Sequence, residues 1–178
     1  MYERLIALVG KEGIKKLQTA KVLVVGLGGV GGYALEALVR SGIKDIHIID
    51  GDKIELSNLN RQIISTIEVV GKNKVDVAEE RILKLNPEVN VTKMNYNLTK
   101  ENIDNILNNN YDFIVDACDD ILAKFLLIEK SLKNNYELIS SMGTANKTNP
   151  ALFSITDLGK TNNDPIARIL RKKSPKEI

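Results

Sequence analysis

The sequence contains a single cysteine, Cys118, among its 178 residues. One cysteine cannot form a disulfide within the chain, and it cannot supply an all-cysteine zinc site. A low cysteine content is typical of proteins that work in a reducing compartment. We therefore expect the protein to be cytoplasmic.

Long apolar stretches are also missing. No segment approaches the roughly 18 apolar residues that a membrane-spanning helix needs, so we expect no membrane partner. The N-terminal segment MYERLIALVGKEG has an acidic residue at position 3 and no continuous apolar stretch with a cleavage site, which argues against a secretory signal. The net charge of +2 is too small to indicate nucleic-acid binding by itself.

Apolar runs of strand length alternate along the chain with segments of helical spacing. The runs are KVLVVG from 21, DIHIID from 45, VNVTKMN from 89, DFIVDA from 112 and ELISSM from 137. This βαβ pattern predicts an α/β fold, a Rossmann-like, doubly wound, mostly parallel sheet with helices on both faces. We expect one domain over 1–178, an N-terminal helix over 3–18 outside the sheet, and a short helix, a loop and a longer helix over 57–86.

The first predicted strand runs directly into glycines with GxGxxG spacing. Gly26, Gly28 and Gly31 form the motif, and Gly29 lies inside it. Without side chains, the backbone N–H groups of such a turn can approach a phosphate at a helix N-terminus. Asp50 follows the second predicted strand, where a carboxylate can accept hydrogen bonds from a ribose. The sequence therefore predicts a nucleotide site, and at this point both NAD and ATP fit it.

A polar segment beginning at this aspartate favours ATP. Within DGDKIELSNLNRQ, residues 50–62, the polar candidates are Asp50, Asp52, Ser57, Asn58, Asn60, Arg61 and Gln62. Cleavage of ATP between its α- and β-phosphates requires cationic and amide donors around the departing pyrophosphate, where negative charge develops. Lys74 offers another cation at the start of a predicted helix, and Asp119 offers an oxygen ligand for Mg²⁺.

Each of these residues also has a simpler interpretation. Lys74 would otherwise be a solvated helix charge, Asp119 a helix N-cap and Asn58 a turn former. Because the strand ends of a doubly wound sheet converge on one crevice, the scattered residues can still meet. A shared nucleotide site explains them together, whereas the simpler interpretations require a separate reason for each.

At these residues the chain resembles the ThiF/MoeB/HesA superfamily, the bacterial relatives of ubiquitin-activating enzymes. GLGGVGG, DGDxxxxSNLNRQ, GKxK and DACDD carry the resemblance, which extends over essentially the whole chain. It implies an enzyme that uses ATP and Mg²⁺ to convert a carboxylate into an acyl adenylate. The implied roles are nucleotide contact for Gly28, ribose binding for Asp50, phosphate contact for Asn58, Arg61 and Lys74, and magnesium binding for Asp119. It also implies a homodimer in which Arg4 reaches the triphosphate of the partner subunit.

The segment TNPALFSITDLGKTNNDPIARILR, residues 148–171, resembles one branch of that superfamily. This branch dehydrates threonylcarbamoyladenosine in tRNA, so the implied substrate is a tRNA whose threonine carboxylate is adenylated. The neighbouring ureido oxygen then closes onto the activated carbonyl and expels AMP. Members normally continue past the point where this chain stops, so the resemblance implies a missing substrate-covering part and ATP binding that survives better than turnover.

Two other functions stay open at this stage. An activator of a sulfur-carrier or ubiquitin-like protein would share the chemistry, and a sulfur-transfer protein would then be a partner. The zinc-binding CxxC pairs usual in that branch are absent here. The second alternative is a non-catalytic or NAD-binding Rossmann module, for which the polar cluster of 57–62 has no role.

Three remaining features have structural interpretations beside functional ones. Cys118 is interpreted as a structural thiol rather than as a thioester-forming nucleophile. His47, the single histidine, is interpreted as a strand side chain. The basic residues near the C-terminus fit either tRNA phosphates or a solvated helix face; they are Arg168, Arg171, Lys172, Lys173 and Lys176.

Overall fold

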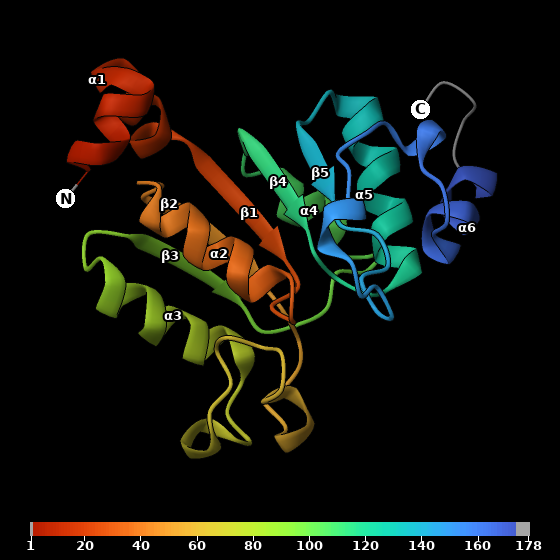
Figure 1. Ribbon diagram of the computed structural model, residues 1–178, viewed down its shortest axis with the longest axis horizontal. Coiled ribbons are helices and arrows are strands. Elements are labelled where there is room, and N and C mark those ends of the chain that lie inside the picture. Colours follow the sequence, from red (N-terminus) through yellow and green to blue (C-terminus); the bar gives the residue numbers. More distant parts are fainter. Residues whose placement is uncertain (1, 174–178) are drawn as a thin grey trace.

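The computed structural model, which describes residues 2–173, contains one five-stranded parallel sheet with the strand order β3-β2-β1-β4-β5 (Figure 1). The strands are β1 (Lys21–Val25), β2 (Asp45–Ile49), β3 (Asn90–Met94), β4 (Phe113–Asp116) and β5 (Leu138–Ser140). The order runs outward from β1 in both directions, so the chain changes direction between β1 and β4. In sheets of this kind a ligand crevice opens at that switch point, beyond the carboxyl ends of the strands.

Helices cover both faces of the sheet, which confirms the predicted α/β fold (Figure 1). The helices α2 (Gly31–Arg40) and α3 (Lys74–Leu85) lie on one face, and α4 (Ile103–Leu107) and α5 (Ile121–Asn134) on the other. The last helix, α6 (Pro165–Lys173), contacts α5. No helix within residues 2–173 is long and apolar enough to cross a membrane.

The N-terminal helix α1 (Glu3–Thr19) lies outside the sheet, as predicted, at the amino end of β1 (Figure 1). It is not a regular helix throughout, because Gly10 has φ 74° and ψ 171°. A glycine tolerates this backbone conformation, which other residues rarely adopt. The break divides α1 into two parts, which the helical spacing of the sequence does not indicate.

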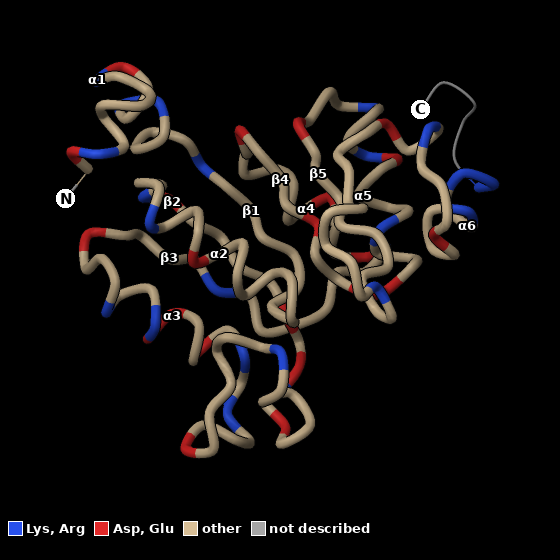
Figure 2. Tube along the Cα trace, viewed as in Figure 1, with Lys and Arg blue, Asp and Glu red and all other residues tan. Residues whose placement is uncertain are grey.

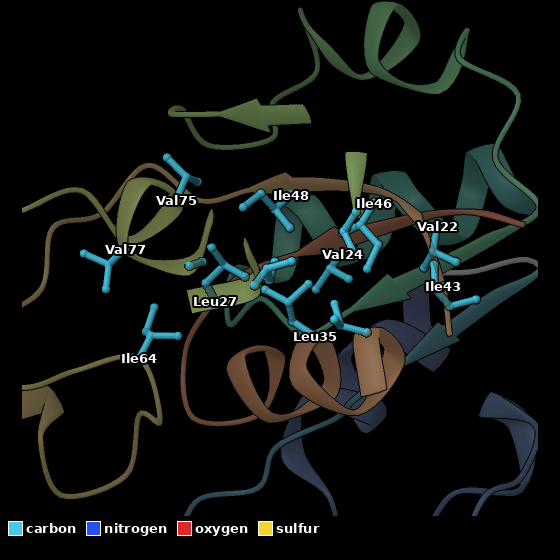
Figure 3. Close-up of a cluster of buried hydrophobic side chains, with 14 of the residues drawn as sticks. Val22, Val24, Leu27, Leu35, Ile43, Ile46, Ile48, Ile64, Val75 and Val77 are labelled. Atoms are coloured by element: carbon cyan, nitrogen blue, oxygen red, sulfur yellow. The ribbon is translucent and has the colours of Figure 1, made fainter. Parts of the chain in front are cut away.

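Alternating residues of the strands build a separate hydrophobic cluster on each face. In β1, Val22 and Val24 pack toward α2 and α3, whereas Leu23 and Val25 pack toward α4 and α5. Figure 3 shows the first cluster, in which Val24 lies near Leu35 of α2 and Val22 lies beside Ile43. Parallel strands buried on both faces carry apolar residues at nearly every position, which explains the continuous run VLVV.

Residues 50–73 leave the sheet after β2 and return at α3, forming the extension at the bottom of Figure 1. The extension contains two short 3-10 helices, η1 (Leu56–Asn58) and η2 (Ile67–Val69). An isolated bridge between Lys53 and Asn73 closes its base, together with a 3.0 Å hydrogen bond from the Lys74 N–H to the Asp52 carbonyl. The predicted short helix, loop and longer helix are therefore present, and the longer helix begins at Lys74.

The turn between β1 and α2 packs its backbone directly against the loop after β4 and against itself. Gly26 has φ 88°, and a Cβ there would lie 2.7 Å from the backbone N and Cα of Cys118. A Cβ at Gly31 would lie 1.8 Å from the Gly26 carbonyl oxygen. A Cβ at Gly29, by contrast, would meet nothing closer than the Arg61 Cγ at 3.4 Å. Packing thus requires glycine at 26 and 31, but it does not require glycine at 29.

We predict that Gly31→Ala lowers the free energy of unfolding by about 1–3 kcal/mol or more, because the added methyl group overlaps a carbonyl that cannot move freely. Gly29→Ala is the matched control and is expected to stay within about 0.5 kcal/mol of the parent. Urea unfolding of both variants measures the difference. Equal stability of the two alanine variants would contradict this account of the turn.

His47 is a buried strand side chain, as predicted. It is 7% exposed, its Nδ1 lies 2.9 Å from the Tyr111 hydroxyl, and the two rings meet edge to face. Burial lowers the pKa of His47, and the nearby Asp45 carboxylate opposes this shift only in part. The folded chain therefore favours the neutral imidazole.

This lowered pKa makes folding stability depend on pH. The unfolded chain binds the proton more readily, so stability is fully present above the ordinary histidine pKa of about 6.5 and falls as the pH drops through the folded value. We expect a lower free energy of unfolding at about pH 5.5 than at about pH 7.5. His47 is the only histidine, so His47→Gln should remove most of that difference. A variant that keeps the whole difference would assign it to other groups.

Candidate nucleotide-binding site

Three loops meet where the sheet changes direction. They are the glycine turn Gly26–Val30 after β1, the segment 50–62 after β2, and the loop 117–120 after β4. The first loop contacts the third at Gly26 and Cys118, and it contacts the second through a hydrogen bond from Leu27 to Asp50. The structure thus brings together segments that the sequence separates widely.

Asp50 links the glycine turn to the segment that follows β2. It is 8% exposed, and its Oδ2 accepts a hydrogen bond from the Leu27 N–H at 2.7 Å. Its Oδ1 accepts a second hydrogen bond from the Asp52 N–H at 2.8 Å. Each carboxylate oxygen can accept more than one hydrogen bond, so both retain capacity toward a ligand.

Lys74 supplies the positive charge beside this carboxylate. Its Nζ lies 2.7 Å from Asp52 Oδ2 and 3.7 Å from Asp50 Oδ2. The residue is 5% exposed, so the interpretation as a solvated helix charge is wrong. Removing a buried partner leaves an uncompensated charge, and a substitution of Lys74 is therefore expected to affect stability as well as binding.

The polar cluster of 57–62 divides into residues that form the turn and residues that face outward. Asn58 is buried, and its Oδ1 accepts a hydrogen bond from the Glu55 N–H at 3.1 Å, so it is a turn former. Arg61 is exposed, and its Nη1 donates to the Ser57 carbonyl at 2.9 Å and to Asn60 Oδ1 at 3.0 Å. The aliphatic part of the Arg61 side chain lies beside Gly29, so the residue is next to the glycine turn.

Gln62 lies under the glycine turn. It is 6% exposed, and its amide nitrogen lies 3.9 Å from where a Cβ of Gly28 would be. Its Oε1 is buried and has no hydrogen-bond partner within the described residues. The backbone N–H groups of Gly28 and Gly29 also have no acceptor among residues 2–173. The N–H groups of Gly28 and Gly29 are therefore available as hydrogen-bond donors in a half-exposed part of the turn. A phosphate site requires such donors.

The loop after β4 carries Asp119, whose side chain is exposed. The interpretation of Asp119 as a helix N-cap is wrong, because the cap of α5 is Asp120, which accepts a hydrogen bond from the Ala123 N–H at 2.7 Å. No group of three or more potential metal ligands occurs within residues 2–173. Mg²⁺ commonly binds through one or two carboxylates together with substrate phosphates, so Asp119 beside a bound nucleotide fits such a site.

Sequence reasoning missed a buried ion pair below this loop. Asp116, the last residue of β4, is 0% exposed, and Lys124 of α5 is 1% exposed. Lys124 Nζ lies 3.1 Å from both carboxylate oxygens. The available signal was the spacing of Lys124 from Leu127 and Ile128, three and four residues later, which places it on the apolar face if the segment is helical.

Cys118 belongs to the same buried network. Its Sγ donates to Asp116 Oδ1 at 3.1 Å. Burial, with the Asp116 carboxylate adding to it, raises the pKa of the Cys118 thiol well above its ordinary value. The thiol therefore stays protonated near neutral pH, which makes it a poor nucleophile and supports its interpretation as a structural residue.

The predicted basic residues of the two ends lie away from the crevice. Arg4 is exposed on α1, at the opposite end of β1 from the glycine turn (Figure 1). Arg171 is partly buried and donates to the Thr161 carbonyl at 2.8 Å. The exposed basic residues of α6 give it the blue segments in Figure 2; they are Arg168, Lys172 and Lys173. Lys176 lies outside the described residues.

Comparisons with known proteins agree with this geometry. The chain is 43% identical over 169 residues to the tRNA threonylcarbamoyladenosine dehydratase of Bacillus subtilis (strain 168), covering 95% of this chain and 66% of that protein. It is 37% identical over 166 residues to the protein of the same name from Escherichia coli (strain K12), covering 93% and 62%. The crystal structure of E. coli TcdA, a tRNA N6-threonylcarbamoyladenosine dehydratase, in complex with ATP is similar, with a TM-score of 0.95, 35% identity and coverage of 97% of this chain and 71% of that one.

The chain spans about two thirds of the length of the curated relatives that it matches. Over residues 2–177 it matches the ThiF family. The motifs that carried the resemblance in the sequence lie in the turn after β1, the segment after β2, the start of α3 and the loop after β4. The chain belongs to the ThiF family.

Proposed function

We propose that the chain binds ATP in this crevice and uses it, with Mg²⁺, to adenylate the threonine carboxylate of threonylcarbamoyladenosine in tRNA. One observation carries the proposal: the glycine turn, the Asp50 carboxylate and the cations Arg61 and Lys74 meet at the switch point of the sheet. A dehydratase with 43% identity and a similar structure with ATP bound support the choice of nucleotide and substrate. A tRNA substrate also supports the expected cytoplasmic location.

The site offers a partner for each part of the nucleotide. The free N–H groups of Gly28 and Gly29 face the phosphates, and Asp50 accepts hydrogen bonds from the ribose hydroxyls. Arg61 and Lys74 are placed to neutralise the charge that develops on pyrophosphate. The remaining candidates for the nucleotide site are the glycines Gly26 and Gly31 and the polar residues Asp52, Ser57, Asn58, Asn60 and Gln62.

Asp119 would hold Mg²⁺ together with phosphate oxygens, and the metal would offset negative charge between the phosphates. A carboxylate oxygen of the substrate attacks the α-phosphorus, and pyrophosphate leaves. The ureido oxygen then attacks the acyl carbonyl, the ureido nitrogen loses its proton, and AMP departs with the former carboxylate oxygen, so the substrate loses the elements of water. Both reacting groups belong to one substrate, so the protein supplies orientation and no nucleophile is required. The raised pKa of Cys118 agrees with this scheme.

The two halves of this proposal, ATP binding and the tRNA substrate, are supported by different observations. Contacts within residues 2–173 support ATP binding. We propose that residues 1–178 form a single domain that carries this ATP site. The relatives alone support tRNA as the substrate. Incubation with ATP, Mg²⁺ and tRNA bearing threonylcarbamoyladenosine, followed by mass analysis of the nucleosides, tests the second half. We expect loss of water from the modified adenosine; ATP turnover that instead requires a carrier protein would favour a sulfur-carrier activator.

Arg61 allows a clean test of the pyrophosphate role, because it is exposed and its removal leaves no buried charge. We predict that Arg61→Ala reduces ATP–pyrophosphate exchange with the tRNA substrate by roughly 10²–10³, the effect of losing one preorganised charge donor to a transition state. Arg40→Ala is the matched control, since Arg40 is exposed and pairs with Glu36 on α2. Exchange at the parent rate in the folded Arg61 variant would make Arg61 a surface charge.

We also propose that two copies form a homodimer in which Arg4 of one subunit completes the site of the other. Arg4 is exposed, and α1 holds it at the far end of its own sheet, away from its own crevice. A two-fold dimer can place such a helix over the partner's crevice. There the guanidinium would add positive charge near the β- and γ-phosphates, as arginine fingers do in other phosphate chemistry.

Mixing variants tests this arrangement. A heterodimer of one Arg4→Ala subunit and one Arg61→Ala subunit has one site with both arginines and one site with neither. In an equal mixture about half of the dimers are heterodimers, and each has one complete site of two. We therefore expect exchange activity of about a quarter of the parent rate, which neither variant shows alone. If activity stays at the level of the separate variants after subunit exchange has been shown, Arg4 does not act across the dimer.

A further inference from the structure

The buried pair of Asp116 and Lys124 satisfies every hydrogen-bonding group that it contains. Lys124 donates to both Asp116 oxygens at 3.1 Å and to the Ser141 carbonyl at 2.7 Å, which uses its three ammonium protons. Asp116 also accepts from the Cys118 N–H at 3.2 Å and from the Ser140 hydroxyl at 2.5 Å. The pair therefore joins α5, the end of β5 and the loop after β4.

Neither charge is placed to touch a ligand. Asp116 is 0% and Lys124 1% exposed, so neither side chain reaches the surface of the crevice. Removing two charges from water has a large desolvation cost, and apolar residues of similar volume often stabilise a fold equally well. A gain in stability is therefore a weak explanation for the presence of this ion pair. The pair does, however, act directly on the geometry of the neighbouring loop.

The loop in question is held on both sides of Asp119. Before it, the Ala117 N–H donates to the Val25 carbonyl at 2.8 Å, and the Cys118 N–H donates to Asp116. After it, the Asp120 carboxylate caps α5. The backbone of Cys118 also lies so close to Gly26 that a Cβ on that glycine would be 2.7 Å away. A small displacement of Cys118 thus moves Asp119 relative to the glycine turn.

We propose that the Asp116–Lys124 pair positions the loop 117–120 against the glycine turn, and that it thereby sets the location of Asp119 for Mg²⁺ in the nucleotide site. The inference rests on the proposed ATP function for the role of Asp119. Lys124 and Asp116 are positioning residues, since they act through the backbone of Cys118. Residues that orient metal ligands typically change metal affinity by about 10–100-fold when they are replaced.

The double variant Asp116→Asn with Lys124→Met tests the proposal, because it removes both charges together and leaves no unpaired buried charge. We expect a folded protein whose loop amides at 117–120 exchange hydrogen for deuterium about tenfold faster than in the parent. We also expect the Mg²⁺ concentration at half-maximal Mg·ATP binding to rise about tenfold, with metal-free ATP binding nearly unchanged. Hydrogen exchange with mass spectrometry and calorimetric titration measure these effects.

Lys130→Met is the matched control, since Lys130 also lies on α5 and pairs with Asp104 of α4. It should leave both the loop exchange and the Mg²⁺ titration at parent values.

Ser140→Ala removes only one hydrogen bond to Asp116, and it tests the positioning role if the double variant does not fold. We expect it to change both measurements in the same direction, by about two- to threefold, as the loss of one modest hydrogen bond predicts.

The two proposals fail in different ways. A parent protein that does not bind ATP would overturn the proposed function, and the loop exchange would still report on positioning. A parent that binds Mg·ATP, compared with a folded double variant whose loop exchange and Mg²⁺ titration match the parent, would overturn the positioning role. Equal changes in the Lys130 control would likewise show that the effect does not belong to the buried pair.

Discussion

The structure of the crevice depends on a close backbone contact between the turn after β1 and the loop after β4. No side chain fits between Gly26 and Cys118, so the two loops are held together by packing of main-chain atoms. The strand order makes this contact possible, because β1 and β4 are neighbours at the point where the sheet changes direction. It fixes the start of the glycine turn against the loop that carries Asp119.

Charge balance maintains this arrangement from two sides. On one side Asp50 is held by the N–H groups of Leu27 and Asp52, with Lys74 beside it. On the other side Asp116 is paired with Lys124. Each carboxylate follows or ends a strand, and each anchors the backbone of a loop that reaches the crevice. An apolar core alone would align the strands, but it would not hold these polar loops in one conformation.

Much of the fold could be predicted from the sequence, and less of the site. The alternating apolar runs predicted all five strands. The helical spacing of apolar residues such as Val75 and Ile82 predicted the longer helix within 57–86, which begins at Lys74. Periodicity reports which face of an element is apolar, but it does not report which charges from different elements meet. For this reason the burial of Lys74 and the pair of Asp116 and Lys124 were not predicted. The alternative interpretation of Asp119 as a helix N-cap was off by one residue, because the sequence pattern does not fix a helix end to a single residue and Asp120 caps α5.

The central claim is that this crevice is built for ATP rather than for a dinucleotide. Two cations, Arg61 and Lys74, lie in the segments that follow the glycine turn, and they suit the charge of a triphosphate. The most direct test is calorimetric titration of the parent chain with ATP in the presence of Mg²⁺ and, separately, with NAD. The account predicts that ATP binds at least about tenfold more tightly, a difference of about 1.4 kcal/mol in binding free energy. Tighter binding of NAD than of ATP would contradict it.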